Sequence, residues 1–293
     1  MTVLLVVNPA AGGADRAVVN QVAEVLVPLG DVELLEAPRD AGAFATEMAR
    51  RMSDGRTSHL VVAGGDGTLN CTINALGHPA PGIVLGLVPM GTGNDLARTL
   101  GLPDDPEDAA RVAVGDRTID LDVCRASGGG VERLFVNACM GGIAVQVNEA
   151  IDDKTKERYG PLAFWIGGAK VLSDLQRFTV VLNGVEVQDC LAAGVGNGRT
   201  CGGGLEVWPA AHPDDGVLEA CALPAGSGPA ALKLAVKVKT GTHDEVPEVA
   251  TVSAEKIELD ARPGIELNVD GELVGLKTPA TFEPVGKIKI AVP

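Results

Sequence analysis

The stretch Leu60–Asn70 reads LVVAGGDGTLN, and it decides the fold of the N-terminal part of the chain. Its first four residues are apolar and predict a buried strand, after which Gly64-Gly65 let the backbone turn sharply and approach a ligand closely. Thr68–Leu76 then has the pattern of a helix. A helix that begins directly after such a turn presents unpaired N–H groups and a positive dipole end, which together suit a phosphate chain.

Asp66 places a carboxylate inside this predicted anion site. Its charge makes electrostatic sense if a cation or a strong donor offsets it, and a metal nucleotide supplies such a cation. The alternative is an ordinary Asp-Gly turn that caps a helix, because both residues are common there for purely local reasons.

A second turn of this kind occurs in Leu87–Arg98, which reads LVPMGTGNDLAR and again joins a buried strand to a helix. Turns at the same end of neighbouring parallel strands face one crevice, where open α/β sheets bind ligands. The chain contains no GxxxxGK[ST] loop, and Leu96 occupies the third glycine position of a dinucleotide fingerprint. The two turns therefore predict a nucleotide site of a different kind.

Residues 1 to about 118 alternate strand-like and helix-like segments with short loops. This alternation predicts an α/β domain with a doubly wound, mostly parallel sheet. The predicted strands are Val3–Val7, Val32–Glu36, His59–Ala63 and Ile83–Val88, and the predicted helices include Arg16–Leu29, Ala41–Met52, Thr68–Leu76 and Asn94–Leu100.

From about residue 119 to residue 293 short apolar runs alternate with Gly, Asn and Asp turns, which predicts a second, mainly β domain of the sandwich type. The last strand could pack back on the first domain, and Ser127–Gly130 is interpreted as a hairpin loop. The predicted strands are Thr118–Arg125, Arg133–Ala138, Phe178–Leu182, Val185–Val195, Val217–Leu223, Lys256–Leu259, Ile265–Val269 and Lys287–Val292. The predicted helices cover about 142–157, 161–175 and 229–240.

The composition excludes several classes of protein. A net charge of −15 argues against a general affinity for nucleic acid or for anionic bilayers. No apolar run of about 18 residues and no export signal are present. The six cysteines include no CxxC pair, so neither a zinc site nor a disulfide framework is indicated, and a reducing cytoplasm is the expected location. The basic run at Lys154, Lys156 and Arg158 is either a local patch or a solvated helix face.

Further motifs accompany the two turns in a fixed order. They are Val7-Asn8-Pro9, Phe135-Val136-Asn137 with Gly141-Gly142, Gly194–Gly198 with Gly202–Gly204, Pro209–Leu218 and Val269–Glu272. With the turns, these motifs resemble the diacylglycerol kinase catalytic family, especially its soluble bacterial lipid kinase branch, over nearly the whole chain. The resemblance implies ATP- and Mg²⁺-dependent phosphorylation of a lipid hydroxyl, with diacylglycerol as the first expected substrate. The alternatives are phosphatidylglycerol, a sphingoid base, or a homologue that binds nucleotide or lipid without turnover.

The resemblance also implies roles for single residues. Asp66 would align the Mg²⁺-bound phosphates, and Glu272 would act as general base on the lipid hydroxyl. The alternative for Glu272 is a solvated position beyond an Asp-Gly hairpin. The residues expected to contact ATP are Asn8, Pro9, Ala10, Ala11, Gly12, Gly64, Gly65, Asp66, Gly67, Thr68, Leu69, Asn70, Gly91, Thr92, Asn94 and Asp95.

A second, structural Mg²⁺ is implied in the loop that follows Ala211. Its ligands would be the Asp215 side chain and the main-chain carbonyls of His212 and Val217, and oxygen donors of this kind suit magnesium. Asp120 would belong to an acidic network between this metal and the cleft, or else is a surface residue at the end of a strand.

Three positions depart from the family pattern. Ala11-Gly12-Gly13 offers neither the hydroxyl nor the ammonium that many relatives carry there, and Glu36–Arg39 lacks the usual threonine. Cys71 stands where many relatives have Glu, and it is either a small buried filler or a redox-sensitive thiol.

The expected partner is a lipid at a membrane surface, met transiently by a cytoplasmic protein, without nucleic acid. Tyr159–Ile166 is interpreted either as an apolar contact for the membrane or as part of a packed helix. The oligomeric state is open, with a homodimer as one alternative.

Overall fold

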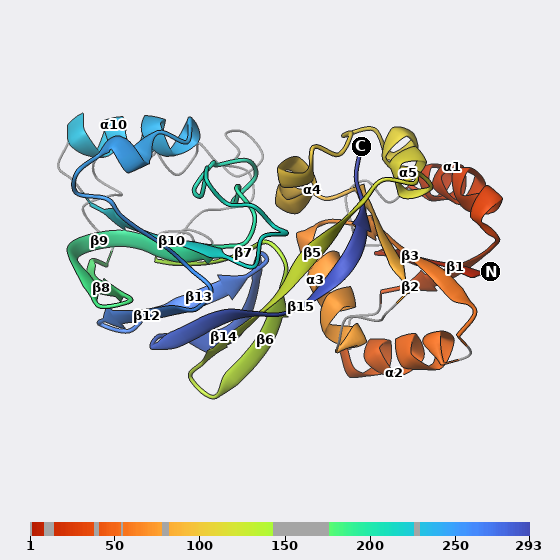
Figure 1. The fold of residues 1–293 in the computed structure, drawn as a ribbon, viewed down its shortest axis with the longest axis horizontal. Helices are drawn as coiled ribbons and strands as arrows, with labels where there is room; N and C mark the ends of the chain where they lie inside the picture. The colour runs from red at the N-terminus through yellow and green to blue at the C-terminus, as the bar shows by residue number, and fades with distance from the viewer. Residues whose placement is uncertain are drawn as a thin grey trace. The chain divides into compact units, whose positions relative to one another are not determined.

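The computed structural model describes residues 2–8, 15–37, 41–53, 55–77, 82–142, 176–225 and 229–293, and it forms two compact units (Figure 1). The first unit contains Met1–Val123, Leu134–Val136 and Val285–Pro293, and the second contains Cys124–Arg133 and Asn137–Pro284. The chain therefore passes between the units several times, within β5 (Thr118–Gly128), near Val136 and within β15 (Ala280–Ala291).

The first unit is a parallel α/β sheet. Its strands lie in the order β15-β4-β3-β1-β2, and every neighbouring pair is parallel. The order reverses direction between β1 and β3, as in a doubly wound sheet, so the predicted architecture is confirmed. The elements are β1 (Thr2–Val7), α1 (Arg16–Leu26), η1 (Val27–Leu29), β2 (Asp31–Glu36), α2 (Ala41–Met52), β3 (Thr57–Gly64), α3 (Asp66–Leu76), β4 (Val84–Pro89), α4 (Asp95–Leu100) and α5 (Pro106–Ala113).

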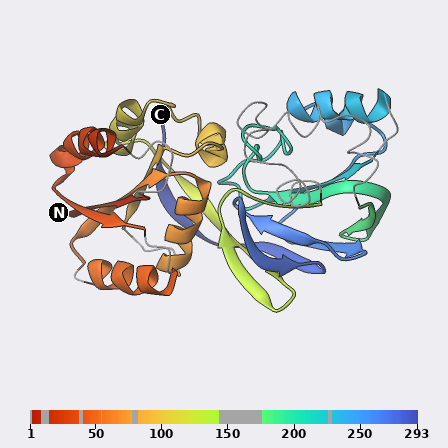
Figure 2. The same ribbon diagram turned by 180° about the vertical axis from the view of Figure 1, so that it is seen from behind.

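Helices cover both faces of this sheet because its strands are apolar on both sides. On one face Val19 and Val22 of α1 and Ala109 of α5 pack against β1 and β3. On the other face Phe44 of α2 and Ile73 of α3 pack against the alternate residues of the same strands. Figures 1 and 2 show α1 and α5 on one side of the sheet and α2 on the opposite side.

The second unit is mainly β, and the strand pairs that lie within it are antiparallel. The predicted β-rich domain is therefore confirmed. Besides part of β5 and β15, its elements are β6 (Val131–Phe135), β7 (Ala138–Gly142), β8 (Phe178–Leu182), β9 (Val185–Gly196), β10 (Leu218–Pro224), α10 (Pro229–Lys239), η3 (His243–Glu245), β11 (Ala250–Ala254), β12 (Ile257–Arg262), β13 (Glu266–Val269) and β14 (Glu272–Lys277).

Several boundaries in this unit differ from the sequence prediction. The single strand expected at Arg133–Ala138 is divided at Val136–Asn137 into β6 and β7. Gly142, expected to start a helix, instead ends β7 with a φ of +87°. A Cβ there would lie 2.2 Å from the Leu191 carbonyl oxygen, so the position requires glycine. The helices expected at about 142–157 and 161–175 otherwise lie outside the described residues.

Other predicted features hold. The hairpin expected at Ser127–Gly130 is present between β5 and β6, with Gly129-Gly130 as its loop, and both of these glycines have positive φ angles. The helix expected at 229–240 is α10. No helix in the described ranges combines the length and the hydropathy that a membrane span requires.

Candidate functional site

The first glycine turn joins β3 to α3 within a single residue. β3 ends at Gly64, Gly65 is the N-cap of α3, and Asp66 is the first helical residue. A Cβ on Gly64 would lie 2.7 Å from the Cβ and the Oγ1 of Thr68, so only glycine fits against the first turn of the helix. Gly65 has no side chain to cap α3, and the N-terminus of the helix carries the positive end of its dipole, which suits an anionic ligand.

The second glycine turn lies directly beside the first. Gly64 pairs with Pro89 at the ends of β3 and β4, and the Met90 N–H donates to the Gly64 carbonyl at 3.0 Å. A Cβ on Gly91 would lie 2.6 Å from the Cα of Gly65. The two turns therefore touch backbone to backbone, as their positions in the sequence predict.

Asn94 fixes the shape of the second turn. It adopts a left-handed backbone with a φ of +51°, which asparagine tolerates better than most residues. Its side chain closes the turn on Gly91, because the Gly91 N–H donates to Oδ1 at 2.9 Å and Nδ2 donates to the Gly91 carbonyl at 2.8 Å. α4 begins at the next residue, Asp95.

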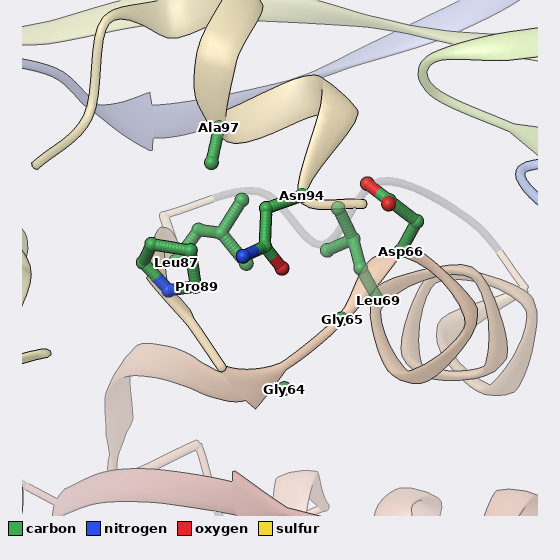
Figure 3. Close-up of a pocket in the computed structure, with 8 residues that line it drawn as sticks. All are labelled: Gly64, Gly65, Asp66, Leu69, Leu87, Pro89, Asn94 and Ala97. Carbon is green, nitrogen blue, oxygen red and sulfur yellow. The ribbon is translucent and has the colours of Figure 1, made fainter. Parts of the chain in front are cut away.

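Asp66 connects the two turns. Its half-buried carboxylate accepts hydrogen bonds from the N–H groups of Asp95 at 3.2 Å and Leu96 at 3.4 Å, the first residues of α4 (Figure 3). Asp66 therefore caps the following helix and not its own, which differs from the local cap that the sequence offered as an alternative. The negative charge stands between the positive ends of two helices, a favourable place for a carboxylate.

A small hollow lies between the turns and above the β-strand ends (Figure 3). Its empty volume of about 160 Å³ includes space that is open to solvent, so it is a shallow recess at the turns and does not enclose a ligand. It is lined by Gly64, Gly65, Asp66, Leu69, Leu87, Pro89, Asn94 and Ala97.

The other predicted ATP contacts in the described part of the chain differ in their exposure. Asn8 follows β1, and its Nδ2 donates to Thr68 Oγ1 at 3.3 Å, which connects the end of β1 to the first turn of α3. Gly67 is half-buried, Thr92 is exposed and Asp95 is buried. The predicted contacts at Pro9, Ala10, Ala11 and Gly12 lie outside the described residues.

Asn70, predicted as an ATP contact, makes a structural hydrogen bond that the sequence did not predict. It is fully buried, and its Nδ2 donates to the Leu134 carbonyl at 2.9 Å. Asn74, one turn later on α3, holds the same residue twice: its Nδ2 donates to the Leu134 carbonyl at 2.9 Å and its Oδ1 accepts from the Leu134 N–H at 3.0 Å. α3 is thus tied to the segment that leads to Asn137.

Glu272 lies in the second unit, at the first residue of β14. Asp270 and Gly271 form the two-residue turn between β13 and β14, and both have positive φ angles, +47° and +88°, as a hairpin of this length favours. The hairpin offered as an alternative is therefore present, and Glu272 is exposed beyond it. A general base must lie within hydrogen-bond reach of the substrate hydroxyl, and an exposed carboxylate is accessible to one, so the hairpin and the catalytic hypothesis are compatible.

In the loop predicted to hold a structural magnesium, the Asp215 carboxylate contacts the backbone of the loop. Asp215 Oδ1 accepts from the Val217 N–H at 2.9 Å, and both His212 and Asp215 are exposed. One carboxylate together with carbonyls and water is a donor set that fits Mg²⁺. Among the described residues, no group of three or more His, Cys, Asp and Glu side chains is gathered for a metal.

Asp120 belongs to the first unit, where the Lys289 ammonium lies 3.0 Å from its carboxylate on the exposed surface of β5. The next aspartate on the same face of this strand, Asp122, was not singled out from the sequence. It is 1% exposed, and its Oδ1 lies 2.9 Å from Lys287 Nζ. A buried aspartate beside a lysine is the stronger candidate for an internal acidic network.

The departures from the expected pattern are partly described. Cys71 is half-buried and packs against the apolar cluster on the α2 and α3 face of the sheet, so both interpretations stay open. Gly13, Pro38, Arg39, the basic run at 154–158 and the apolar segment at 159–166 lie outside the described residues.

Comparisons with known proteins agree with this geometry. Residues 2–126 match the family model described as the diacylglycerol kinase catalytic domain, and residues 137–291 match the YegS C-terminal NAD kinase beta sandwich-like domain. The two matches correspond to the α/β part and the β-rich part of the structure.

Relatives match over most of their own length. A protein of Stenotrophomonas maltophilia named "Probable lipid kinase YegS-like" is 34% identical over 73% of this chain and 72% of its own. A protein of Staphylococcus epidermidis named "Diacylglycerol kinase" is 28% identical over 95% of this chain and 87% of its own. The crystal structure of a diacylglycerol kinase from Bacillus anthracis superposes with a TM-score of 0.76 at 25% identity and covers 100% of this chain and 97% of that one.

Proposed function

The chain belongs to the family of diacylglycerol kinase catalytic domains, and we propose that it phosphorylates the hydroxyl group of diacylglycerol with Mg²⁺ and ATP. Membership makes it a kinase with an alcohol group as the acceptor and ATP as the phosphoryl donor. The observation that supports the proposal best is the close backbone approach of Gly91 to Gly65, which brings the N-termini of α3 and α4 to one shallow recess.

The residues of the first unit would bind the nucleotide phosphates. Gly65, Asp66 and Leu69 at the start of α3 line the hollow, and the positive dipole ends of α3 and α4 favour negative charge there. Asp66 keeps α4 in register with α3. Magnesium bound with the phosphates supplies the charge neutralisation that phosphoryl transfer requires.

Glu272 would take the proton from the lipid hydroxyl while the hydroxyl oxygen attacks the γ-phosphorus and ADP leaves. The exposed carboxylate has room for a substrate, and the Asp270-Gly271 turn gives it a defined backbone position. The His212–Val217 loop would hold the structural magnesium through the Asp215 carboxylate and main-chain carbonyls.

The proposal is tested by transfer of labelled phosphate from ATP to diacylglycerol in mixed micelles with Mg²⁺. Phosphatidylglycerol and a sphingoid base are assayed in parallel, and transfer to one of them alone would replace diacylglycerol as the acceptor. Nucleotide binding by calorimetry without transfer to any lipid of the panel would show a binding protein and refute the kinase proposal.

Asp66 needs a matched control because it caps α4. Asp66→Ala is expected to abolish transfer, and Asp105→Ala removes a comparable cap from α5, where Asp105 Oδ1 accepts from the N–H groups of Glu107 at 3.0 Å and Asp108 at 3.1 Å. Loss of either cap costs about 0.5–2 kcal/mol of stability. If both variants lose the same activity, Asp66 acts through stability alone.

The reaction would take place at a membrane surface, because diacylglycerol resides in the bilayer and ATP reaches it from the cytoplasm. We therefore place the protein in the cytoplasm, with a transient peripheral contact to the membrane and no nucleic acid partner. Co-sedimentation with diacylglycerol-containing vesicles tests this contact.

A further inference from the structure

Asp270 is a buried aspartate two residues before the proposed base, and its carboxylate contacts the backbone at the start of β7. It is 4% exposed, and Oδ1 accepts hydrogen bonds from the N–H groups of Asn137 at 3.0 Å and Ala138 at 2.9 Å. The Asp270 N–H in turn donates to the Ala138 carbonyl at 2.8 Å. A turn residue is thereby joined to the first residue of β7 in both directions.

This connection extends the pairing of the strands by one residue. β13 is antiparallel to β7, and the last regular pair joins Val269 to Cys139. Beyond that pair the Asp270 side chain replaces the backbone as the acceptor for Ala138 and adds Asn137 as a second donor. The turn at Asp270-Gly271 is therefore anchored to a neighbouring strand as well as to its own hairpin.

Glu272 depends on this turn for its position. It is exposed at the start of β14, and among the described residues no hydrogen bond or ion pair holds its carboxylate. Its backbone pairs with Val269, directly across the turn. A change in the turn would consequently move the carboxylate, while the apolar side chains of β13, such as Leu267, keep the sheet together.

We infer that Asp270 is a positioning residue for Glu272, and that its carboxylate fixes the turn that presents the base to the lipid hydroxyl. The inference rests on the proposed function, since it requires Glu272 to act as the base. It assigns to Asp270 no contact with substrate, nucleotide or metal. Its effect is on the geometry of proton transfer, which tolerates small displacements poorly.

A second hairpin of the same unit provides a matched control. Asn183-Gly184 joins β8 to β9 with φ angles of +44° and +87°, like Asp270-Gly271. The Asn183 N–H donates to the Glu258 carbonyl at 3.0 Å, and its Oδ1 accepts from the Glu258 N–H at 2.6 Å. Asn183 therefore both donates to and accepts from a neighbouring strand, as Asp270 does at its own turn. No proposed catalytic residue lies beside the Asn183-Gly184 turn.

The experiment compares Asp270→Ala, Asp270→Asn, Asn183→Ala and Glu272→Gln in the full chain. Asp270→Ala is expected to lower kcat by about 10²-fold with little change in KM for ATP, because the base is displaced while the nucleotide site is not. Asp270→Asn keeps the acceptor oxygen and is expected to restore most of kcat. Asn183→Ala is expected to lower the melting temperature without lowering kcat.

The outcomes separate the inference from the proposed function. If Glu272→Gln keeps full kcat, the base assignment is wrong and Asp270 has nothing to position. If Glu272→Gln is inactive but Asp270→Ala keeps kcat, the base stands and the positioning inference is overturned. If a folded Asp270→Asn is as inactive as Asp270→Ala, the negative charge itself acts in the reaction and the inference is again overturned.

Amide hydrogen exchange provides a readout that needs no activity. Loss of the Asp270 acceptor is expected to speed exchange at Asn137 and Ala138 in Asp270→Ala and to leave it slow in Asp270→Asn. Unchanged protection at both amides in Asp270→Ala would show that the carboxylate does not hold the turn.

Discussion

Replacing Gly91 by alanine tests the contact between the two glycine turns. The new Cβ would lie 2.6 Å from the Cα of Gly65 and 2.9 Å from Asn94 Oδ1. Ordinary contacts begin at 3.4 Å, so the turns must separate by about 0.8 Å, and the first obstacle is backbone, which cannot rotate away. Overpacking of this kind costs about 1–3 kcal/mol.

The expected loss of activity is larger than the loss of stability suggests. A displacement near 1 Å at a site that positions reacting groups can lower the rate about 10²-fold. We expect Gly91→Ala to lower kcat/KM for ATP by this order and to lower the melting temperature by roughly 2–4 °C per kcal/mol. The assay is phosphate transfer from labelled ATP, together with a thermal melt.

Two alanine variants calibrate this result. Gly65→Ala brings its Cβ only to 3.1 Å from the Gly91 Cα, so its effect should be smaller. Gly82→Ala meets nothing within 4 Å but strains a φ of +84°, which costs about 1–2 kcal/mol at the opposite end of β4. If Gly91→Ala keeps its activity, or if Gly82→Ala loses as much, the contact between the turns does not form the nucleotide site.

Two further predictions concern titratable groups. Burial raises the pKa of the Cys190 and Cys221 thiols to about 12. At pH 8 iodoacetamide should therefore modify the half-exposed Cys71 and Cys201 far faster than these two thiols in the native protein. Equal rates of modification would contradict the burial of Cys190 and Cys221. Burial also lowers the pKa of His243, so as the pH falls below about 6.5 the unfolded chain binds a proton at this histidine before the folded protein does. Urea unfolding should therefore show a free energy of unfolding that decreases from pH 7.5 to pH 5.5, with a smaller decrease in His243→Gln. An equal decrease in both proteins would exclude His243 as a source of the pH dependence.

The α/β part of the fold could be predicted because its signals are local. Buried apolar runs such as Leu60–Ala63 end in glycine turns, and each turn is followed by helical spacing, so the alternation of strand and helix is visible without tertiary information. The order of the strands then follows from the rules for parallel sheets. The place where Gly65 and Gly91 meet could be inferred for the same reason.

The tasks of the polar side chains could not be predicted because their partners are distant in the sequence. Asp66 caps a helix that begins 29 residues later, and Asn74 holds Leu134, 60 residues away. Asp120 and Asp122 share one face of β5, and the sequence does not tell which of them is covered; the structure buries Asp122 and exposes Asp120.

The division of Arg133–Ala138 into two strands has the same cause. Its residues have the apolar pattern of a single strand, but the N–H groups of Asn137 and Ala138 are taken by Asp270, more than 130 residues later. A side chain that replaces a backbone partner leaves no periodic signal in the sequence.

The central claim is that the two glycine turns and Glu272 serve one reaction, the phosphorylation of a lipid hydroxyl by ATP. Its most direct test is the transfer of labelled phosphate from ATP to diacylglycerol by the wild-type chain and by Glu272→Gln. We expect labelled phosphatidic acid with the wild type and a loss of transfer of at least about 10²-fold with the variant, which is the lower end of the contribution of a general base. Equal transfer by both proteins, or transfer to no lipid by a wild type that binds ATP, would contradict it.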